Sequence, residues 1–196
     1  MDNQPLPAAR QRLLDAGLEL LLERGYHGVG IQAVLDASLT PKGSFYHHFR
    51  DKEDFALQVI DAYMAGVHGA LDVSLADVSV PPLERVRGFF GLVAGGYAKD
   101  GYLGCLLGGL GQELSGVSPV FAQRIDGCLS YIADRLAEPL DEARSVGDLP
   151  PSTDPKALAT RLVDCWEGAA LRSRLSRDPA PLREMLDFFF HAATRE

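Results

Sequence analysis

The residues with the richest chemistry in this chain lie close together, between Pro41 and Phe49. Phe45 and Phe49 are four positions apart, so on a helix both would point inward and anchor it. The other side chains of this stretch are hydrogen-bond donors or a cation: Lys42, Ser44, Tyr46, His47 and His48. Gly43 leaves the backbone bare beside them. A helix of this kind is suited to approach another molecule closely.

Nucleic acid is the partner that these groups suit best. Lys42 and Lys52 can neutralise phosphates, and hydroxyl and imidazole groups can reach base edges or phosphate oxygens. A short apolar pattern at Ile31, Val34 and Leu35 precedes a tight turn over residues 37–40. The sequence therefore predicts two short helices joined by a turn, with the second helix reading DNA.

Helical periodicity predicts the elements that position this segment. Residues 8–24 carry a stripe of five leucines: Leu13, Leu14, Leu18, Leu21 and Leu22. A longer helix begins at Asp51, which is a plausible cap. Further helical patterns occupy residues 83–98, 103–115, 118–144, 154–175 and 179–193. No segment alternates with period two, so the expected class is all-α with about nine helices.

Composition limits the classes of protein to consider. The net charge is −8, which excludes a protein that coats nucleic acid nonspecifically. Residues 1–55 hold six Lys and Arg against eight Asp and Glu, so DNA binding must depend on a local surface. No apolar run approaches the roughly 18 residues of a membrane span. The polar residues 1–7 do not read as a secretory signal, and we expect a cytoplasmic protein with no membrane contact.

An enzyme, a metal or a cofactor is not expected. The sequence contains no HExxH, no GxSxG, no P-loop and no GxGxxG after a strand. Cys105, Cys128 and Cys165 form neither a CxxC pair nor the spacing of a zinc site. In a reducing cytoplasm, the simplest interpretation of each cysteine is a small buried hydrophobe.

The segments ARQRLLDAGLELLLERGYHGVGIQAVL and TPKGSFYHHFRDKEDF together resemble the TetR/AcrR family of bacterial transcriptional regulators. The resemblance implies a helix-turn-helix DNA-binding domain over residues 1–50 and a ligand-binding and dimerisation domain over 51–196. The residues that it places against double-stranded operator DNA are Gln32, Thr40, Lys42, Gly43, Ser44, Tyr46, His47, His48 and Lys52. Two positions depart from the family pattern: Gly30 replaces a capping Ser or Thr, and Ser38 replaces a frequent turn glycine.

The body has the mixture of apolar walls and scattered polar groups that small-molecule sites in helical bundles show. We expect a small-molecule effector, although an aromatic stripe is more often plain core. The candidate ligand-binding residues are Tyr63, His68, Phe89, Phe90, Tyr97, Tyr102, Cys105, Gln112, Phe121 and Trp166.

The last two helices are expected to pair across a two-fold axis into a homodimer, as the resemblance implies. The first has an apolar face with small residues: Leu162, Cys165, Trp166, Gly168, Ala169 and Ala170. The second carries Phe188, Phe189 and Phe190 in succession, more than one side of a helix can bury in its own domain.

Residues 101–115 are rich in glycine and form a poor autonomous helix. In the family, the corresponding helix connects the ligand pocket to the DNA-binding domain. Cys105 lies near its start, where a helix N-terminus would favour the thiolate. The motif also resembles regulators adjacent to reductases that clear electrophiles, so thiol sensing by Cys105 is an alternative to a buried cysteine.

The function that these features predict is a ligand-responsive repressor that leaves its operator when a small molecule binds the body. The alternatives are a transcriptional activator and a thiol-based electrophile or redox sensor. The sequence does not separate activation from repression.

Overall fold

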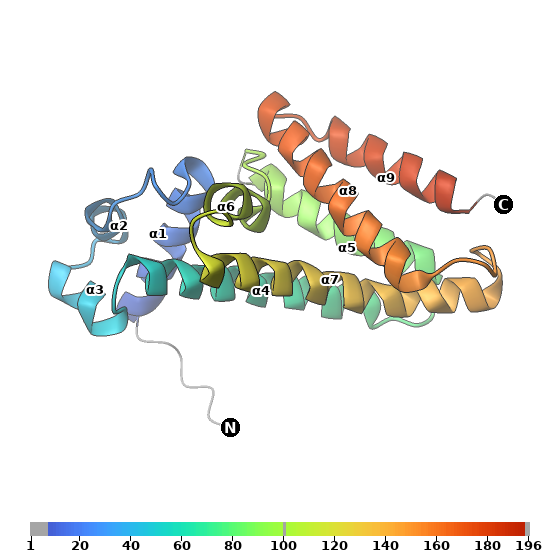
Figure 1. Ribbon diagram of the computed structural model, residues 1–196, viewed down its shortest axis with the longest axis horizontal. Coiled ribbons are helices and arrows are strands. Elements are labelled where there is room, and N and C mark those ends of the chain that lie inside the picture. The colour runs from blue at the N-terminus through green and yellow to red at the C-terminus, as the bar shows by residue number, and fades with distance from the viewer. Residues whose placement is uncertain (1–7, 100, 195–196) are drawn as a thin grey trace, which may run out of the picture.

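The computed structural model describes residues 8–99 and 101–194, which form nine helices and no strand (Figure 1). The helices are α1 Ala8–Arg24, α2 Ile31–Ser38, α3 Lys42–His48, α4 Lys52–Leu75, α5 Pro82–Lys99, α6 Leu106–Leu114, α7 Pro119–Val146, α8 Pro155–Ser176 and α9 Ala180–Ala193. The predicted all-α class is confirmed. None of these helices combines the length and the apolar character that a membrane crossing requires.

Helices α1 to α3 form a small head at one end of the molecule (Figure 1). The predicted leucine stripe of α1 faces its core, with Leu13, Leu14 and Leu21 almost fully buried. Gly30 is the N-cap residue of α2 and provides no side-chain hydrogen bond to it, as the departure from the family pattern suggests.

The turn after α2 differs from expectation in one respect. The left-handed residue is Leu39, with φ of 51°, and not Ser38. Ser38 stays helical, and its hydroxyl donates a hydrogen bond to the Leu35 carbonyl. The position sensitive to backbone strain therefore lies one residue later than the sequence indicated.

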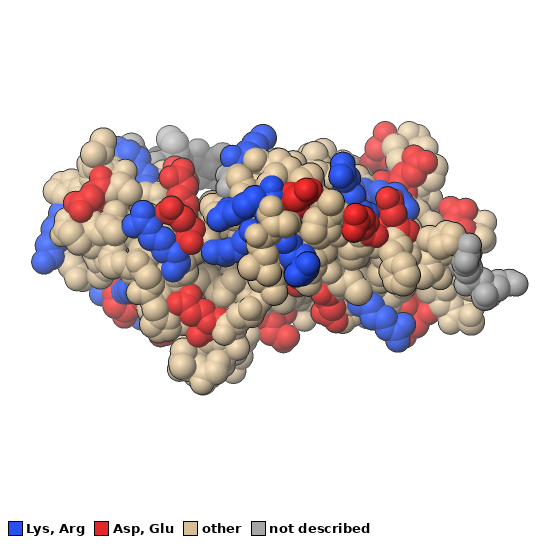
Figure 2. All heavy atoms as spheres, turned by 90° about the horizontal axis from the view of Figure 1, so that it is seen from above, with Lys and Arg blue, Asp and Glu red and all other residues tan. Residues whose placement is uncertain are grey.

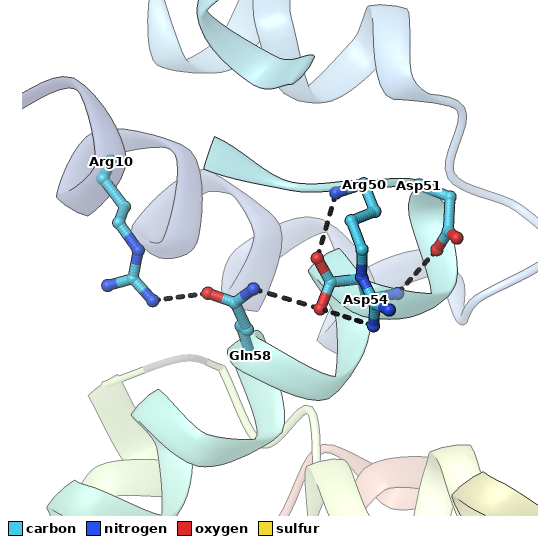
Figure 3. Close-up of polar contacts among 5 residues, drawn as sticks. All are labelled: Arg10, Arg50, Asp51, Asp54 and Gln58. Atoms are coloured by element: carbon cyan, nitrogen blue, oxygen red, sulfur yellow. Dashed lines mark hydrogen bonds and ion pairs between the residues drawn. The ribbon is translucent and has the colours of Figure 1, made fainter. Parts of the chain in front are cut away.

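A polar network fixes the start of α4, as Figure 3 shows. The Asp51 carboxylate caps the helix by accepting the Asp54 backbone N–H at 2.8 Å, which confirms the predicted cap. Asp54 in turn accepts hydrogen bonds from the Arg50 backbone and from Gln58, and Gln58 accepts one from Arg10 on α1. The Arg50 backbone hydrogen bond is the main reason that the pKa of Asp54 is lowered.

Helices α4 to α9 form the larger body. Helices α4 and α7 run along the long axis, and α8 and α9 lie above them in the view of Figure 1. Caps at both ends define α7: the Ser118 hydroxyl accepts from the Phe121 N–H, and Gly147 adopts the left-handed conformation. The short helix α6 lies between the head and the rest of the body, where it packs against α1, α4 and α7.

Candidate nucleic-acid interface and effector cavity

Helix α3 is fixed to the head by aromatic side chains. Phe45 and Phe49 are 0% and 1% exposed, and both rings stack near Phe55 of α4, with centroids 5.2 and 5.0 Å from it. Burial of this cluster holds one side of α3 rigidly. The predicted inward anchoring of Phe45 and Phe49 is confirmed.

The opposite side of α3 is open to solvent. Lys42, Gly43, Tyr46 and His47 are exposed, Tyr46 by 54% of its surface, while Ser44 is half-buried. A Cβ placed on Gly43 would meet no atom of the chain within 4 Å. Packing within the protein therefore gives no reason for glycine at this position.

His48 is half-buried at the edge of this surface, and its ring centroid lies 5.0 Å from that of His47. Burial is the main cause that lowers the pKa of His48, and the neighbouring His47 and Arg10 add to it. The imidazole therefore stays neutral to a lower pH than usual, and it can donate or accept a hydrogen bond.

Two of the residues predicted to face DNA do not point outward. Thr40 is only 6% exposed, and its hydroxyl donates to the Ser38 carbonyl, so the expectation for its side chain is wrong in this conformation. The Lys52 ammonium donates to the Tyr26 carbonyl at 2.7 Å and lies 4.1 Å from the centre of the Tyr26 ring. This geometry engages Lys52 within the protein rather than with a phosphate.

Gln32 is exposed on α2, and its amide donates to Asp36 one helical turn later. Arg50, which the sequence analysis did not single out, follows α3 directly and has a side chain 83% exposed. Arg12 of α1 donates to the Ser38 carbonyl and thereby holds the turn before α3. Its position directly after the buried Phe49 could have indicated Arg50 from the sequence.

DNA binding by a chain of net negative charge requires a local surface. On the face that Figure 2 shows, Lys and Arg are interspersed with Asp and Glu. This distribution agrees with the net charge of −8. Specific DNA binding would therefore depend on the surface of α3 and its immediate neighbours.

Six of the ten candidate ligand residues meet in the body. They line one small aromatic chamber of about 30 Å³ together with Glu167: Tyr63, Phe89, Phe90, Tyr97, Cys105 and Trp166. The Trp166 indole N–H donates to the Tyr97 hydroxyl at 3.4 Å. The Tyr63 hydroxyl lies 3.6 Å from the Cys105 sulfur. The chamber is thus apolar with a few aligned polar groups, as expected of a ligand site.

A larger cavity of about 300 Å³ lies between the end of α1, helix α6 and helix α8. Cys105 and Glu167 line both this outer cavity and the chamber, and Gln112 lines the outer cavity. Glu167 was missed by the sequence analysis, although a carboxylate beside Trp166 on an apolar helix was a usable signal. Burial is the first cause that raises the pKa of Glu167.

The other three candidates lie elsewhere. His68 lines a separate groove between α4 and α7, with its ring 4.6 Å from that of Tyr131. Phe121 is 1% exposed and packs edge-on against Tyr26 of the head, so it belongs to the core. Tyr102 lies in the loop before α6 with φ of 59°.

Cys105 occupies the cap position of α6, but its environment does not favour the thiolate. The side chain is buried, and burial together with the nearby Glu167 raises the pKa of the Cys105 thiol to about 12. Desolvation and the nearby Glu167 thus outweigh the hydrogen bonds from the Gly108 backbone and the Tyr63 side chain, so this environment opposes the activation that was expected of the helix N-terminus.

The apolar face predicted for dimerisation is largely used inside the protomer. Leu162, Trp166 and Ala170 are at most 4% exposed. Cys165 of the predicted face is exposed, which contradicts its expected burial, and the large apolar side chains left outside on the same two helices are Leu171, Leu175 and Phe188, exposed by 42%, 69% and 75%. Of the three consecutive phenylalanines, Phe190 is buried and Phe188 points outward, so one side of α9 does not bury all three.

Within residues 8–99 and 101–194, nine helices form an aromatic-anchored helix-turn-helix head and a cavity-containing body, the architecture of a helical DNA-binding regulator. Residues 13–59 match the family described as bacterial regulatory proteins, tetR family, and residues 82–189 match the Tetracyclin repressor-like, C-terminal domain. The chain belongs to the TetR family of transcriptional regulators.

Individual relatives agree with this assignment. The chain is 42% identical over 189 residues to the transcriptional regulator AcuR of Cereibacter sphaeroides, covering 95% of this chain and 86% of AcuR. It is 33% identical to the transcriptional repressor DhaR of a Mycobacterium species, covering 93% and 91%. A crystal structure of a regulatory protein TetR from Rhodobacter sphaeroides superposes with a TM-score of 0.91 at 41% identity, covering 94% and 98%.

Proposed function

We propose that this regulator is a homodimeric repressor that binds double-stranded operator DNA through α3 and is released by a small-molecule effector. The observation that carries the DNA-binding part is the surface of α3, with Lys42, Tyr46 and His47 exposed around an uncovered Gly43. Repression is favoured over activation because DhaR, a relative covering most of the chain, is named a repressor. We place the boundary between the two domains at residues 50 and 51, between the end of α3 and the start of α4.

We assign the effector site to the aromatic chamber and the outer cavity that shares Cys105 and Glu167 with it. The outer cavity, at about 300 Å³, is at the lower end of the size range of ligand pockets. The chamber is too small in this conformation for more than one or two waters. An effector that enters from the outer cavity would therefore have to open the chamber and move α6.

We assign the dimer interface to the outward face of α8 and α9. Leu171 and Leu175 are one helical turn apart on α8, and Phe188 is the most exposed large apolar residue of α9. Large apolar side chains left exposed on two helices that pack together favour an interface there. Two-fold pairing would place two α3 helices for successive major grooves.

In vitro selection from random DNA with the wild-type protein tests the repressor function directly. The proposal expects one palindromic sequence to be enriched and to be protected in a footprint at both half-sites. Metabolites are then screened for release of this DNA, with emission of Trp166, the one tryptophan in the chain, as a binding signal. Enrichment of no sequence contradicts the function, and release without any change in Trp166 emission contradicts the chamber.

A thiol-based response through Cys105 is the second candidate, because its sulfur lies on the wall shared by the outer cavity and the chamber. With a pKa of about 12, its thiolate fraction should rise about tenfold for each pH unit between 7 and 10. Iodoacetamide labelling, located by mass spectrometry, measures this rate. Fast labelling at pH 7 that does not change with pH would contradict the buried thiol, and DNA release by an electrophile in Cys105→Ser would exclude thiol sensing.

A further inference from the structure

The loop after α1 is held by one carboxylate from the body. Glu113, near the end of α6, accepts the Tyr26 backbone N–H at 2.7 Å and the His27 backbone N–H at 2.6 Å. Its Oε1 atom also lies 2.6 Å from Nδ1 of the His27 ring. These residues are separated by 86 or 87 positions in sequence, so the contact joins the head to the body.

The head is shaped to receive this carboxylate. Gly25 adopts φ of +71°, and a Cβ at that position would meet Oε2 of Glu113 at 2.6 Å. A side chain on residue 25 would therefore both strain the backbone and displace Glu113. Glycine at this position is explained by the approach of Glu113 together with the left-handed turn.

The loop and the last turn of α1 before it, which contains Glu23, are held from two other helices of the body. Lys52 of α4 donates to the Tyr26 carbonyl, the polar group opposite the N–H that Glu113 accepts. Arg174 of α8 donates to the Glu23 carbonyl at 3.3 Å. In the loop, Glu113 therefore holds the Tyr26 N–H, and Lys52 holds the Tyr26 carbonyl.

Burial works to raise the pKa of Glu113, but hydrogen bonds from the His27 and Tyr26 backbone outweigh it and leave the pKa below its ordinary value. The carboxylate is therefore charged at neutral pH. Hydrogen bonds to a charged acceptor are stronger than those between neutral groups.

Helix α6 connects this contact to the proposed effector site. Cys105 is at its N-cap position and lines both the chamber and the outer cavity, and Glu113 lines the outer cavity as well. Cys105 and Glu113 are eight positions apart, about 12 Å along a helix. A shift of α6 at its first turn would therefore be felt at Glu113 with no intervening loop.

We propose that Glu113 is the positioning residue through which α6 sets the orientation of the DNA-reading head, by clasping the backbone of Tyr26 and His27. The inference rests on the proposed function for its operator readout, but the clasp itself can be tested without DNA. The decisive variant is Glu113→Gln, which has nearly the same shape. The glutamine side chain has only one acceptor oxygen, and its NH2 group is a donor that cannot accept from a backbone N–H. At least one of the two hydrogen bonds is therefore lost.

Amide hydrogen exchange of the whole chain provides the first test. In Glu113→Gln, exchange at Tyr26 and His27 should become about tenfold faster or more, while the amides of α7 and α8 keep their protection. Ser115→Ala, at an exposed position directly after the same helix, is the matched control and should leave the loop unchanged. Unchanged exchange at Tyr26 and His27 in Glu113→Gln would overturn the proposal, whatever the DNA result.

The second test separates positioning from simple loss of stability. The probes are the operator fragment selected by the wild-type protein and the same fragment with one base pair inserted between its half-sites. Wild type should discriminate by about tenfold or more, and Glu113→Gln by about threefold or less, because loosened heads adapt to either spacing. An equal loss of affinity for both fragments, with discrimination intact, would overturn positioning.

The variant Gly25→Ala tests the same contact from the residue of the head that lies against Glu113. If its methyl group acts by displacing Glu113, the double variant with Glu113→Gln should lose no more spacing discrimination than the stronger single variant. Additive losses would contradict a shared contact. Failure of the wild type to select any DNA would refute the proposed function and leave the exchange experiment to decide the clasp.

Discussion

Helices α3 and α6 are both short and both contain glycine, but the surroundings of their glycines are opposite. A Cβ on Gly43 of α3 would meet nothing within 4 Å. On α6, a Cβ at Gly108 would overlap the Glu167 carboxylate, and one at Gly111 would touch Ile125 at 3.5 Å. The glycine of α3 is uncovered, whereas two of the three glycines of α6, Gly108 and Gly111, are covered by the chain itself.

This difference indicates that α3 presents a surface to an external partner, whereas α6 connects parts of the same chain. Helix α3 is anchored on one side by Phe45 and Phe49 and leaves the other side free. Helix α6 is engaged at both ends, by Cys105 beside Tyr63 and by Glu113 on the Tyr26 N–H. A free glycine on an anchored helix suits close approach of DNA, whereas glycines under side chains suit a helix that moves with its neighbours.

The largest expected effect is loss of the proposed dimer, which would set the positions of both heads. Leu175→Asp combined with Phe188→Asp should give a folded monomer, because each introduces a charge into the proposed interface. Operator affinity should fall by about 100-fold or more as two linked half-sites become independent. Sedimentation and DNA binding measure the two effects.

Val146→Asp, at an exposed site outside that face, is the control and should remain dimeric. Trp166→Asp should instead unfold the body, since Trp166 is buried in the protomer. A wild-type protein that sediments as a monomer would contradict the interface.

The next effect concerns the exposed side of α3. Lys42→Ala and Tyr46→Ala should each weaken operator binding by about 1–3 kcal/mol if they contact DNA. Helical content and dimerisation should not change, because both side chains are exposed. Anisotropy titrations at one fixed salt concentration measure the loss, and undiminished affinity in both variants would refute the assignment of α3.

Local sequence signals were sufficient for the helices and for most of the α3 surface. The spacing of Phe45 and Phe49 and the cap at Asp51 depend on neighbouring residues, and both predictions are confirmed. Periodicity identifies an apolar face but does not say whether it packs within the protomer or against a partner. For this reason, Trp166 was misassigned to the dimer face although it is buried in the protomer.

Contacts between distant segments could not be predicted from the sequence. The Glu113 contact with Tyr26 joins positions 87 apart, and no local pattern marks it. Burial of the Cys105 thiol depends on packing from several helices, and it reverses the effect expected from the helix N-terminus. Thr40 likewise turns inward because the turn after α2 closes over it.

A smaller effect tests the covered glycines of α6. Gly108→Ala should be less stable than Gly109→Ala by about 1 kcal/mol, because the methyl group at position 108 must displace Glu167 and this cost offsets the helix propensity that alanine gains. Gly109→Ala is the matched control, since its Cβ would meet only Arg174 at 3.8 Å, an ordinary contact. Urea unfolding compares the two variants. Equal stability of both would contradict the view that α6 glycines accommodate neighbouring side chains.

The most direct test of the account is Gly43→Ala, measured for both stability and operator affinity. Alanine should stabilise α3 by up to about 1 kcal/mol, because it favours the helix and meets no atom of the chain. The same methyl group should lower operator affinity by about tenfold if the DNA approaches the bare backbone, equivalent to about 1.4 kcal/mol. Increased stability with weaker operator binding is the predicted result. Increased stability with unchanged affinity would show that DNA does not approach α3 at Gly43 and would contradict the account.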